Sequence, residues 1–178
     1  MRYLVFSDIH GSAFFARRIE ELVNKENPDK VILLGDLYYH GPRNSLPQGH
    51  NPMEVCEIFN SMQDKIYCVK GNCDAEVDEM ISQFDMMSNL ELEIGSKKFF
   101  FTHGHKFNID NMPEIDFDVL VYGHFHTGFI KENEGKIFVN AGSISLPKNG
   151  TPNSFLVITD DEIVLKDIDE NIISSKKI

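Results

Sequence analysis

Tyr3-Leu4-Val5-Phe6-Ser7-Asp8 and Val31-Ile32-Leu33-Leu34-Gly35-Asp36 are the two stretches that decide the fold. Each is a short apolar run that ends in an aspartate, which is typical of a buried strand. Between the two stretches, apolar residues recur at helical spacing and stop near Asn27-Pro28; they are Phe14, Phe15, Ile19, Leu22 and Val23. A strand, a helix and a second strand in this order predict a parallel sheet with a right-handed crossover.

The remaining apolar runs predict one further helix, two single strands and three hairpins. The helix is expected at Met53–Met62, and the single strands at Lys65–Val69 and Asp118–Tyr122. Turn residues separate the strand pairs of the hairpins, which are expected at residues 90–94 with 97–101, 129–131 with 136–139, and 155–159 with 163–166. Residues 38–52 form a long loop rich in Pro, Gly and Asn, a kind of segment that is often functional. The order of these helices, strands and hairpins along the chain predicts an α/β fold with mixed sheets, in one domain over residues 1–178.

The composition excludes several classes of protein. The chain has 178 residues, 42% of them apolar, and a net charge of −11. No apolar run reaches the ~18 residues of a membrane span, and an acidic chain lacks the basic stripes that bind nucleic acid. Three cysteines without framework spacing and no long apolar leader lead us to expect a cytoplasmic protein.

The acidic residues gather between His50 and Gly95, where Lys65 and Lys70 are the only basic residues. Such a run is typical of solvated helix faces and turns, and an acidic face for a protein partner is the alternative.

Five of the predicted strands end in side chains that ligate metals. The stretches are Asp8-Ile9-His10, Gly35-Asp36, Gly71-Asn72, His103-Gly104-His105 and Gly123-His124-Phe125-His126. Ligands of open α/β sheets gather outside the carboxyl ends of strands. Carboxylate, amide and imidazole donors suit Mn²⁺, Fe²⁺ or Zn²⁺. Their number exceeds the needs of one ion and fits two ions ~3.5–4 Å apart.

The order of these motifs resembles that of the calcineurin-like metallophosphoesterases, and in particular the small bacterial YfcE-type phosphodiesterases. The resemblance extends over about Met1–Ile168 and implies an α/β/β/α sandwich, that is, two mixed sheets flanked by helices. It further implies two divalent ions, with Mn²⁺ expected first and Fe²⁺, Zn²⁺, Ni²⁺ or Co²⁺ also suited. One ion takes Asp8, His10 and His126. The other takes Asn72, His103 and His124, and Asp36 bridges the two. A hydroxide between the ions is the expected nucleophile.

Three further residues are candidates for catalysis. Cys73 follows Asn72, where many members of the family carry a histidine that serves as general acid. A thiol is a poorer proton donor, and packing beside the site is the alternative role. His40 and Arg43 lie in the long loop, where they are expected to contact the phosphate oxygens. His105 is expected either to orient a metal ligand or to cap a turn.

The resemblance implies a metal-dependent phosphodiesterase that acts on small diesters. A phosphomonoesterase or nucleotide phosphatase is the alternative of the same class, and a metal-free interaction scaffold of the same fold is the alternative from another class. A nuclease fits poorly with the net charge of −11. We expect no nucleic-acid polymer or membrane as partner. A homodimer or homotetramer through an exposed strand edge is compatible with the sequence.

Overall fold

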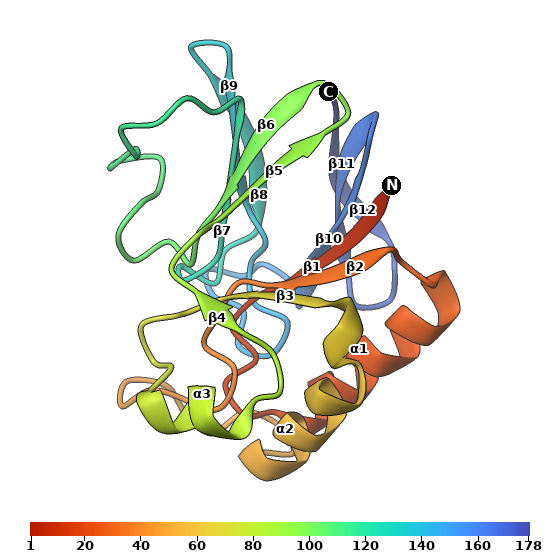
Figure 1. Ribbon diagram of the computed structural model, residues 1–178, viewed down its shortest axis with the longest axis vertical. Coiled ribbons are helices and arrows are strands. Elements are labelled where there is room, and N and C mark those ends of the chain that lie inside the picture. Colours follow the sequence, from red (N-terminus) through yellow and green to blue (C-terminus); the bar gives the residue numbers. More distant parts are fainter.

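The computed structural model describes residues 1–178 (Figure 1), and its first unit is the one that the opening stretches predict. Strand β1 (Arg2–Phe6) leads through helix α1 (Ala13–Glu26) to strand β2 (Lys30–Leu33). The two strands pair in parallel, as predicted. The Ser12 hydroxyl caps α1 by accepting a hydrogen bond from the Phe15 amide (3.3 Å), which satisfies one of the free amides of the first turn.

The first sheet has seven strands in the order β12-β11-β10-β1-β2-β3-β4. The remaining members are β3 (Ile66–Val69), β4 (Met86–Met87), β10 (Ser154–Thr159), β11 (Glu162–Asp167) and β12 (Ile172–Lys177). Strands β1 to β4 are mutually parallel, whereas β10, β11 and β12 join antiparallel. The sheet is therefore mixed.

The second sheet has five strands in the order β5-β6-β7-β9-β8. They are β5 (Leu90–Ile94), β6 (Lys97–Phe101), β7 (Val119–Tyr122), β8 (Phe129–Asn133) and β9 (Lys136–Asn140). The hairpin β5–β6 closes at Gly95-Ser96 with Ile94 opposite Lys97, as predicted. Strands β6, β7 and β9 run in parallel, so their carboxyl ends lie at one edge.

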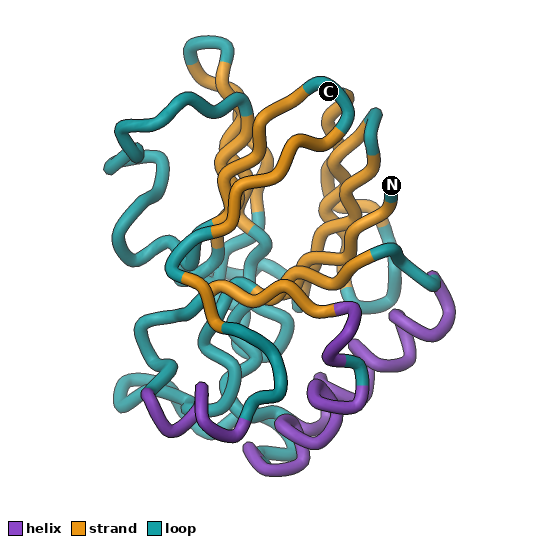
Figure 2. The backbone as a smooth tube through the Cα atoms, in the orientation of Figure 1, coloured by secondary structure: helices purple, strands orange, loops and turns teal.

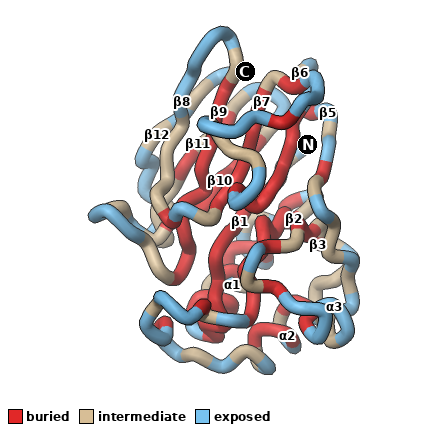
Figure 3. The backbone as a smooth tube through the Cα atoms, turned by 90° about the vertical axis from the view of Figure 1, so that its left-hand side faces the viewer, coloured by how far each residue is buried: buried red, intermediate tan, exposed pale blue.

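Two apolar cores hold three layers together. On β1, Leu4 and Phe6 point toward the helices, and Tyr3 and Val5 point into the space between the sheets, because alternate side chains leave a strand on opposite faces. Helices α1, α2 (Pro52–Ser61) and α3 (Glu76–Ile81) lie together beside the seven-stranded sheet (Figure 2). The burial map shows the inner strands buried and the connecting loops exposed (Figure 3). The two-sheet sandwich of the predicted fold class is confirmed.

The outer face of the five-stranded sheet carries no helix. Residues 102–118 cover it instead, with Phe107 and Ile109 packed against a small cluster of buried residues, namely Phe100, Phe117, Leu120, Tyr122 and Phe138. Irregular backbone therefore supplies the fourth layer of the sandwich in this chain.

Three of the α-helices and strands were not predicted, and neither was the short 3₁₀ helix η1 (Gln63–Lys65). Helix α3 has six residues and a mostly exposed, acidic sequence, so it has no apolar stripe to detect. Strand β12 reads Ile-Ile-Ser-Ser-Lys-Lys without alternation, because it is an exposed edge held by backbone pairing to β11. Strand β4 has only two residues. None of the helices combines the length and the apolarity that a membrane crossing needs.

Candidate metal centre

The candidate ligands meet where the carboxyl ends of strands from both sheets come together. The tips of β1, β2 and β3 supply residues from the first sheet, and those of β6 and β7 supply residues from the second. A hydrogen bond from the His124 amide to Asp8 Oδ2 (2.9 Å) joins the two sheets at this point. The structure brings together all seven predicted ligands; Asp8, His10, Asp36, His103 and His126 are buried, His124 is half-buried and Asn72 is exposed.

One half of the site consists of Asp8, His10 and His126. Asp8 Oδ1 lies 3.2 Å from His126 Nε2 and 3.6 Å from His10 Nε2. The two imidazole Nε2 atoms lie 3.2 Å apart. Three ligand atoms from β1 and β7 tips thus face a common point.

The other half consists of Asn72, His103 and His124. The Asn72 Oδ1 atom lies 3.0 Å from His103 Nε2. His124 Nδ1 lies 3.2 Å from the same nitrogen. Burial, followed by the neighbouring His103, lowers the pKa of His124 to about 4, so its ring is neutral and carries a free electron pair at neutral pH.

Asp36 stands between the two halves. Its Oδ2 atom lies 3.7 Å from His10 Nε2, and its Oδ1 atom lies 3.5 Å from His103 Nε2. The Cys73 amide donates a hydrogen bond to Oδ1 (2.8 Å). One carboxylate therefore presents one oxygen to each half.

The hydrogen bonds around the imidazoles show that the site suits a cation. The Nδ1 atoms of His10, His103 and His126 lie 2.7, 2.7 and 2.6 Å from backbone carbonyl oxygens. A carbonyl only accepts, so each Nδ1 carries a proton, and Nε2 is the ring atom turned into the site. Asp8 Oδ1 is buried beside them without a hydrogen-bond partner. A buried carboxylate oxygen and imidazole Nε2 atoms this close together form a donor set that suits a bound cation.

Asp8 carries its negative charge in this setting. Burial alone would raise the pKa of its carboxyl group, but the imidazoles of His10 and His126 outweigh that effect and hold the pKa well below its usual range. The carboxylate is therefore available as an oxygen ligand at neutral pH.

The ligand backbones are strained. Five of the seven have φ in the left-handed region, with values of 57°, 52°, 55°, 64° and 58° for Asp8, His10, Asp36, His124 and His126. Each such residue costs about 1–3 kcal/mol and persists only where its surroundings enforce it. Five of the nine non-glycine residues with positive φ in the chain are therefore ligands of this one site.

Residues that the sequence did not single out hold this backbone in place. The hydroxyls of Ser143 and Ser145 each donate to the Asp8 carbonyl oxygen (2.8 Å each). The Asp74 carboxylate accepts hydrogen bonds from three amides, those of Asp36, Leu37 and Gly71. In the sequence, Asp74 could have been recognised from its place in the motif Gly71-Asn72-Cys73-Asp74. Ser143 could have been recognised from the turn Asn140-Ala141-Gly142-Ser143.

Gly123→Ala tests how closely the two sheets must approach at the site. A Cβ atom at Gly123 would lie 1.8 Å from Ser7 Oγ and 2.6 Å from Asp8 Oδ2, so Asp8 must move. We expect the free energy of unfolding in chelator to fall by about 1–3 kcal/mol and metal affinity to fall at least tenfold, measured by urea denaturation and calorimetric titration. The control Gly135→Ala has nothing within 4 Å and should leave metal affinity unchanged.

A groove of about 220 Å³ opens over the centre. Arg43, Cys73 and Lys148 line it beside the ligands, and Lys148 had no signal in the sequence. His40 does not line it, since its ring packs edge-on against Tyr39 and His50 with centroids 4.9 and 5.5 Å away. Phe125 is exposed, and its ring packs edge-on against the rings of His124 and Tyr122, with centroids 5.1 and 6.2 Å away.

The Cys73 thiol remains protonated. Burial, followed by the neighbouring Asp36 carboxylate, raises its pKa to about 12. It lies within reach of His10 and Asp36, with ligand atoms inside 4.8 Å of one another.

A family model described as the calcineurin-like phosphoesterase superfamily domain matches residues 1–162. The chain belongs to this superfamily. It is 41% identical to the phosphodiesterase YfcE of Escherichia coli K12 over 164 residues, covering 90% of this chain and 89% of the relative. It is 30% identical to the probable metallophosphoesterase YsnB of Bacillus subtilis, covering 89% and 84%. The solved structure of Yfce, a phosphoesterase from E. coli, superposes with a TM-score of 0.96 and 36% identity over 100% of both chains.

Membership confirms the family predicted from the motif order. The chain is a metallophosphoesterase, and the family implies a divalent metal. The two sets of donors fit such an ion, because oxygen and nitrogen atoms lie close together in each of them.

Proposed function

We propose that this chain is a phosphodiesterase that hydrolyses small diesters at a centre of two divalent ions. The observation that carries the proposal is the position of Asp36, whose two oxygens face His10 and His103 from opposite halves of the site. A carboxylate in this position suits two ions held close together.

The residues divide into two ligand sets. Asp8, His10 and His126 would hold one ion, and Asn72, His103 and His124 the other, with Asp36 shared. Two divalent ions there would supply a hydroxide nucleophile for in-line attack and offset the charge on the phosphate oxygens. Mn²⁺ is the ion we propose first, because the donors are oxygen and imidazole nitrogen without thiolate, while Fe²⁺, Zn²⁺, Ni²⁺ and Co²⁺ suit the same donors.

The groove suits a small, singly charged substrate. Arg43 and Lys148 line it and would bind the phosphate oxygens. Two divalent ions, two carboxylates and one hydroxide leave a net charge of about +1, which matches one charge on a diester better than two on a monoester. A net charge of −11 on the whole chain opposes a long polyanion.

Cys73 is proposed as the proton donor to leaving groups that need one. Its protonated thiol lines the groove, but a high pKa makes it a weak acid. We expect Cys73→Ala to change kcat for bis-p-nitrophenyl phosphate by less than about threefold, since nitrophenolate leaves readily without a proton. For diphenyl phosphate the loss should be about tenfold or more. Equal losses on both substrates would contradict this role.

A paired assay tests the choice of substrate. Chelator-stripped protein reloaded with Mn²⁺ is assayed on bis-p-nitrophenyl phosphate and p-nitrophenyl phosphate, which share a leaving group. We expect kcat/KM to be at least tenfold higher on the diester. A higher value on the monoester would establish the phosphomonoesterase alternative, and no hydrolysis of either would favour the scaffold.

We further propose a cytoplasmic location and assembly into a homodimer or homotetramer. Cys56, Cys68 and Cys73 are all free thiols, which suits a reducing compartment. The exposed edge strand β12 carries Ile172 and Ile173, 68% and 43% exposed, and exposed edges pair readily. Light scattering in solution reports the oligomeric state.

A further inference from the structure

A second, larger pocket lies beside the centre, with a volume of about 500 Å³. Three segments form it: the end of β3, the connection from β4 to β5, and the segment that follows β6. Its lining residues are Lys70, Gly71, Ser88, Asn89, Thr102, His105, Lys106 and Phe107. The volume falls in the range of pockets that bind small organic molecules.

This pocket borders the half of the centre made by Asn72, His103 and His124. Gly71 directly precedes Asn72 in the chain. The His105 ring lies 5.4 Å from the His103 ring and 6.2 Å from the His124 ring, measured between centroids. His105 thus lines the pocket and lies next to two ligands of the centre, although the pocket and the groove share no lining residue.

The lining has positive charge and hydrogen-bonding groups but no carboxylate. Lys70 is paired with Glu79, whereas the exposed Lys106 has no ion-pair partner. Ser88, Asn89 and Thr102 offer hydroxyl and amide groups, which pair with hydroxyls. Lys106 is therefore an unpaired cation beside a polar pocket, on a chain whose net charge is −11.

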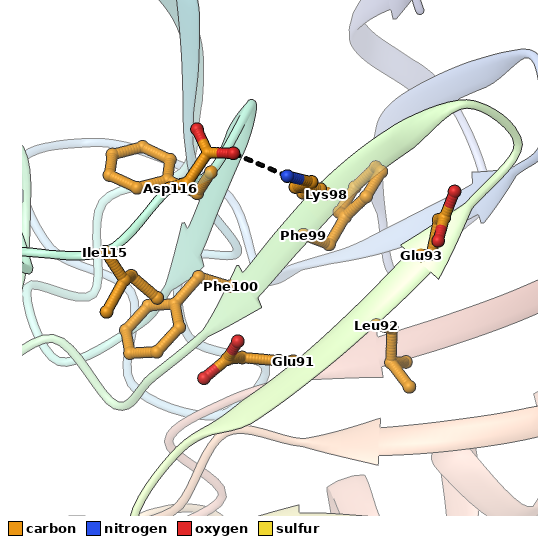
Figure 4. Close-up of a pocket in the computed structure, with 9 residues that line it drawn as sticks. Glu91, Leu92, Glu93, Lys98, Phe99, Phe100, Ile115 and Asp116 are labelled. Carbon is orange, nitrogen blue, oxygen red and sulfur yellow. Dashed lines mark hydrogen bonds and ion pairs between the residues drawn. The ribbon is translucent and has the colours of Figure 1, made fainter.

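The hollow in Figure 4 offers no comparable arrangement. It has about 170 Å³ and lies between β5, β6 and residues 115–117. Its lysine, Lys98, is already paired with Asp116 (2.5 Å). None of its lining residues is a proposed ligand or a direct chain neighbour of one, whereas Gly71 of the larger pocket directly precedes Asn72.

We propose that the larger pocket is the subsite for the ester group that stays on the phosphorus, and that Lys106 selects groups that carry hydroxyls and a negative charge. This inference rests on the proposed function. It assigns a specificity-determining role to Lys106, through attraction between its ammonium group and the anionic substituent.

Three p-nitrophenyl phosphodiesters with the same leaving group test the subsite. Their remaining ester groups are methyl, choline and glycerate, which are neutral, cationic and anionic. For the Mn²⁺-loaded wild-type protein, we expect KM for the glycerate ester to be at least threefold lower than for the choline ester, with similar kcat. In Lys106→Glu the preference should invert, so that the ratio of the two KM values changes at least tenfold.

The exposed Lys177 on β12 provides the matched control, because it lines neither pocket. Lys177→Glu makes the same change in net charge and should keep the wild-type ratio of KM values. An unchanged ratio in Lys106→Glu, or the same change in Lys177→Glu, would overturn the subsite while hydrolysis of the methyl ester still upholds the proposed function. Failure of the wild-type protein to hydrolyse the methyl ester would overturn both.

Discussion

Asp36→Ala is expected to lower kcat/KM for bis-p-nitrophenyl phosphate by at least 10³-fold. The change removes the one carboxylate that faces both halves of the centre, with oxygens 3.7 Å from His10 Nε2 and 3.5 Å from His103 Nε2. A loss of 10³ corresponds to about 4 kcal/mol of transition-state stabilisation, which is in the range of the several kcal/mol that metal ions contribute. Metal content by mass spectrometry should fall from two ions per chain to one or none.

Two further variants separate this effect from misfolding. Asp36→Asn keeps an oxygen to accept the hydrogen bond from the Cys73 amide (2.8 Å in the wild type) and removes the charge, so it should fold and lose activity to a similar extent. Asp116→Asn removes an exposed carboxylate that pairs with Lys98 away from the centre and should retain full activity. Full activity in Asp36→Asn would refute the shared-ligand role.

Metal removal is expected to abolish hydrolysis and to lower the melting temperature. Without a cation, Asp8 Oδ1 lacks a partner and the His10 and His126 Nε2 atoms face each other at 3.2 Å. Ligand at 100 times its Kd stabilises the folded state by about 2.7 kcal/mol, which for a chain of this size amounts to about 5–10 °C. Scanning calorimetry of stripped and reloaded protein measures the shift.

Calcium is a useful control for that experiment. It prefers six to eight oxygen ligands, whereas four of the seven proposed ligands are histidines, so Ca²⁺ should produce a much smaller shift than Mn²⁺. Equal stabilisation by both ions, or none by either, would contradict the proposed donor set.

The strands and most of the candidate ligands could be predicted because they share one strong pattern. Asp8, Asp36, Asn72 and His103 each come just after a buried apolar run, and strand ends gather at one edge. The pattern could not show how two sheets bring these ends together. That depends on contacts such as the His124 amide on Asp8 Oδ2, which join residues far apart in the chain.

The residues that escaped the sequence analysis lack a local signal. Lys148 lines the groove from an irregular segment. In such a segment neither a periodic pattern of apolar residues nor a motif predicts which way a side chain points. His40, which the sequence analysis did name, packs against Tyr39 and His50 and does not line the groove. Strand β12 depends on pairing with β11, and its own sequence does not alternate.

Titration of stripped protein with Mn²⁺ tests the central claim most directly. The initial rate of bis-p-nitrophenyl phosphate hydrolysis is recorded as the metal is added in fractions of an equivalent at a protein concentration well above Kd. The proposed centre predicts no hydrolysis without metal and a rate that stops rising at two equivalents per chain. Hydrolysis by the stripped protein, or a rate that stops rising at one equivalent, would contradict it.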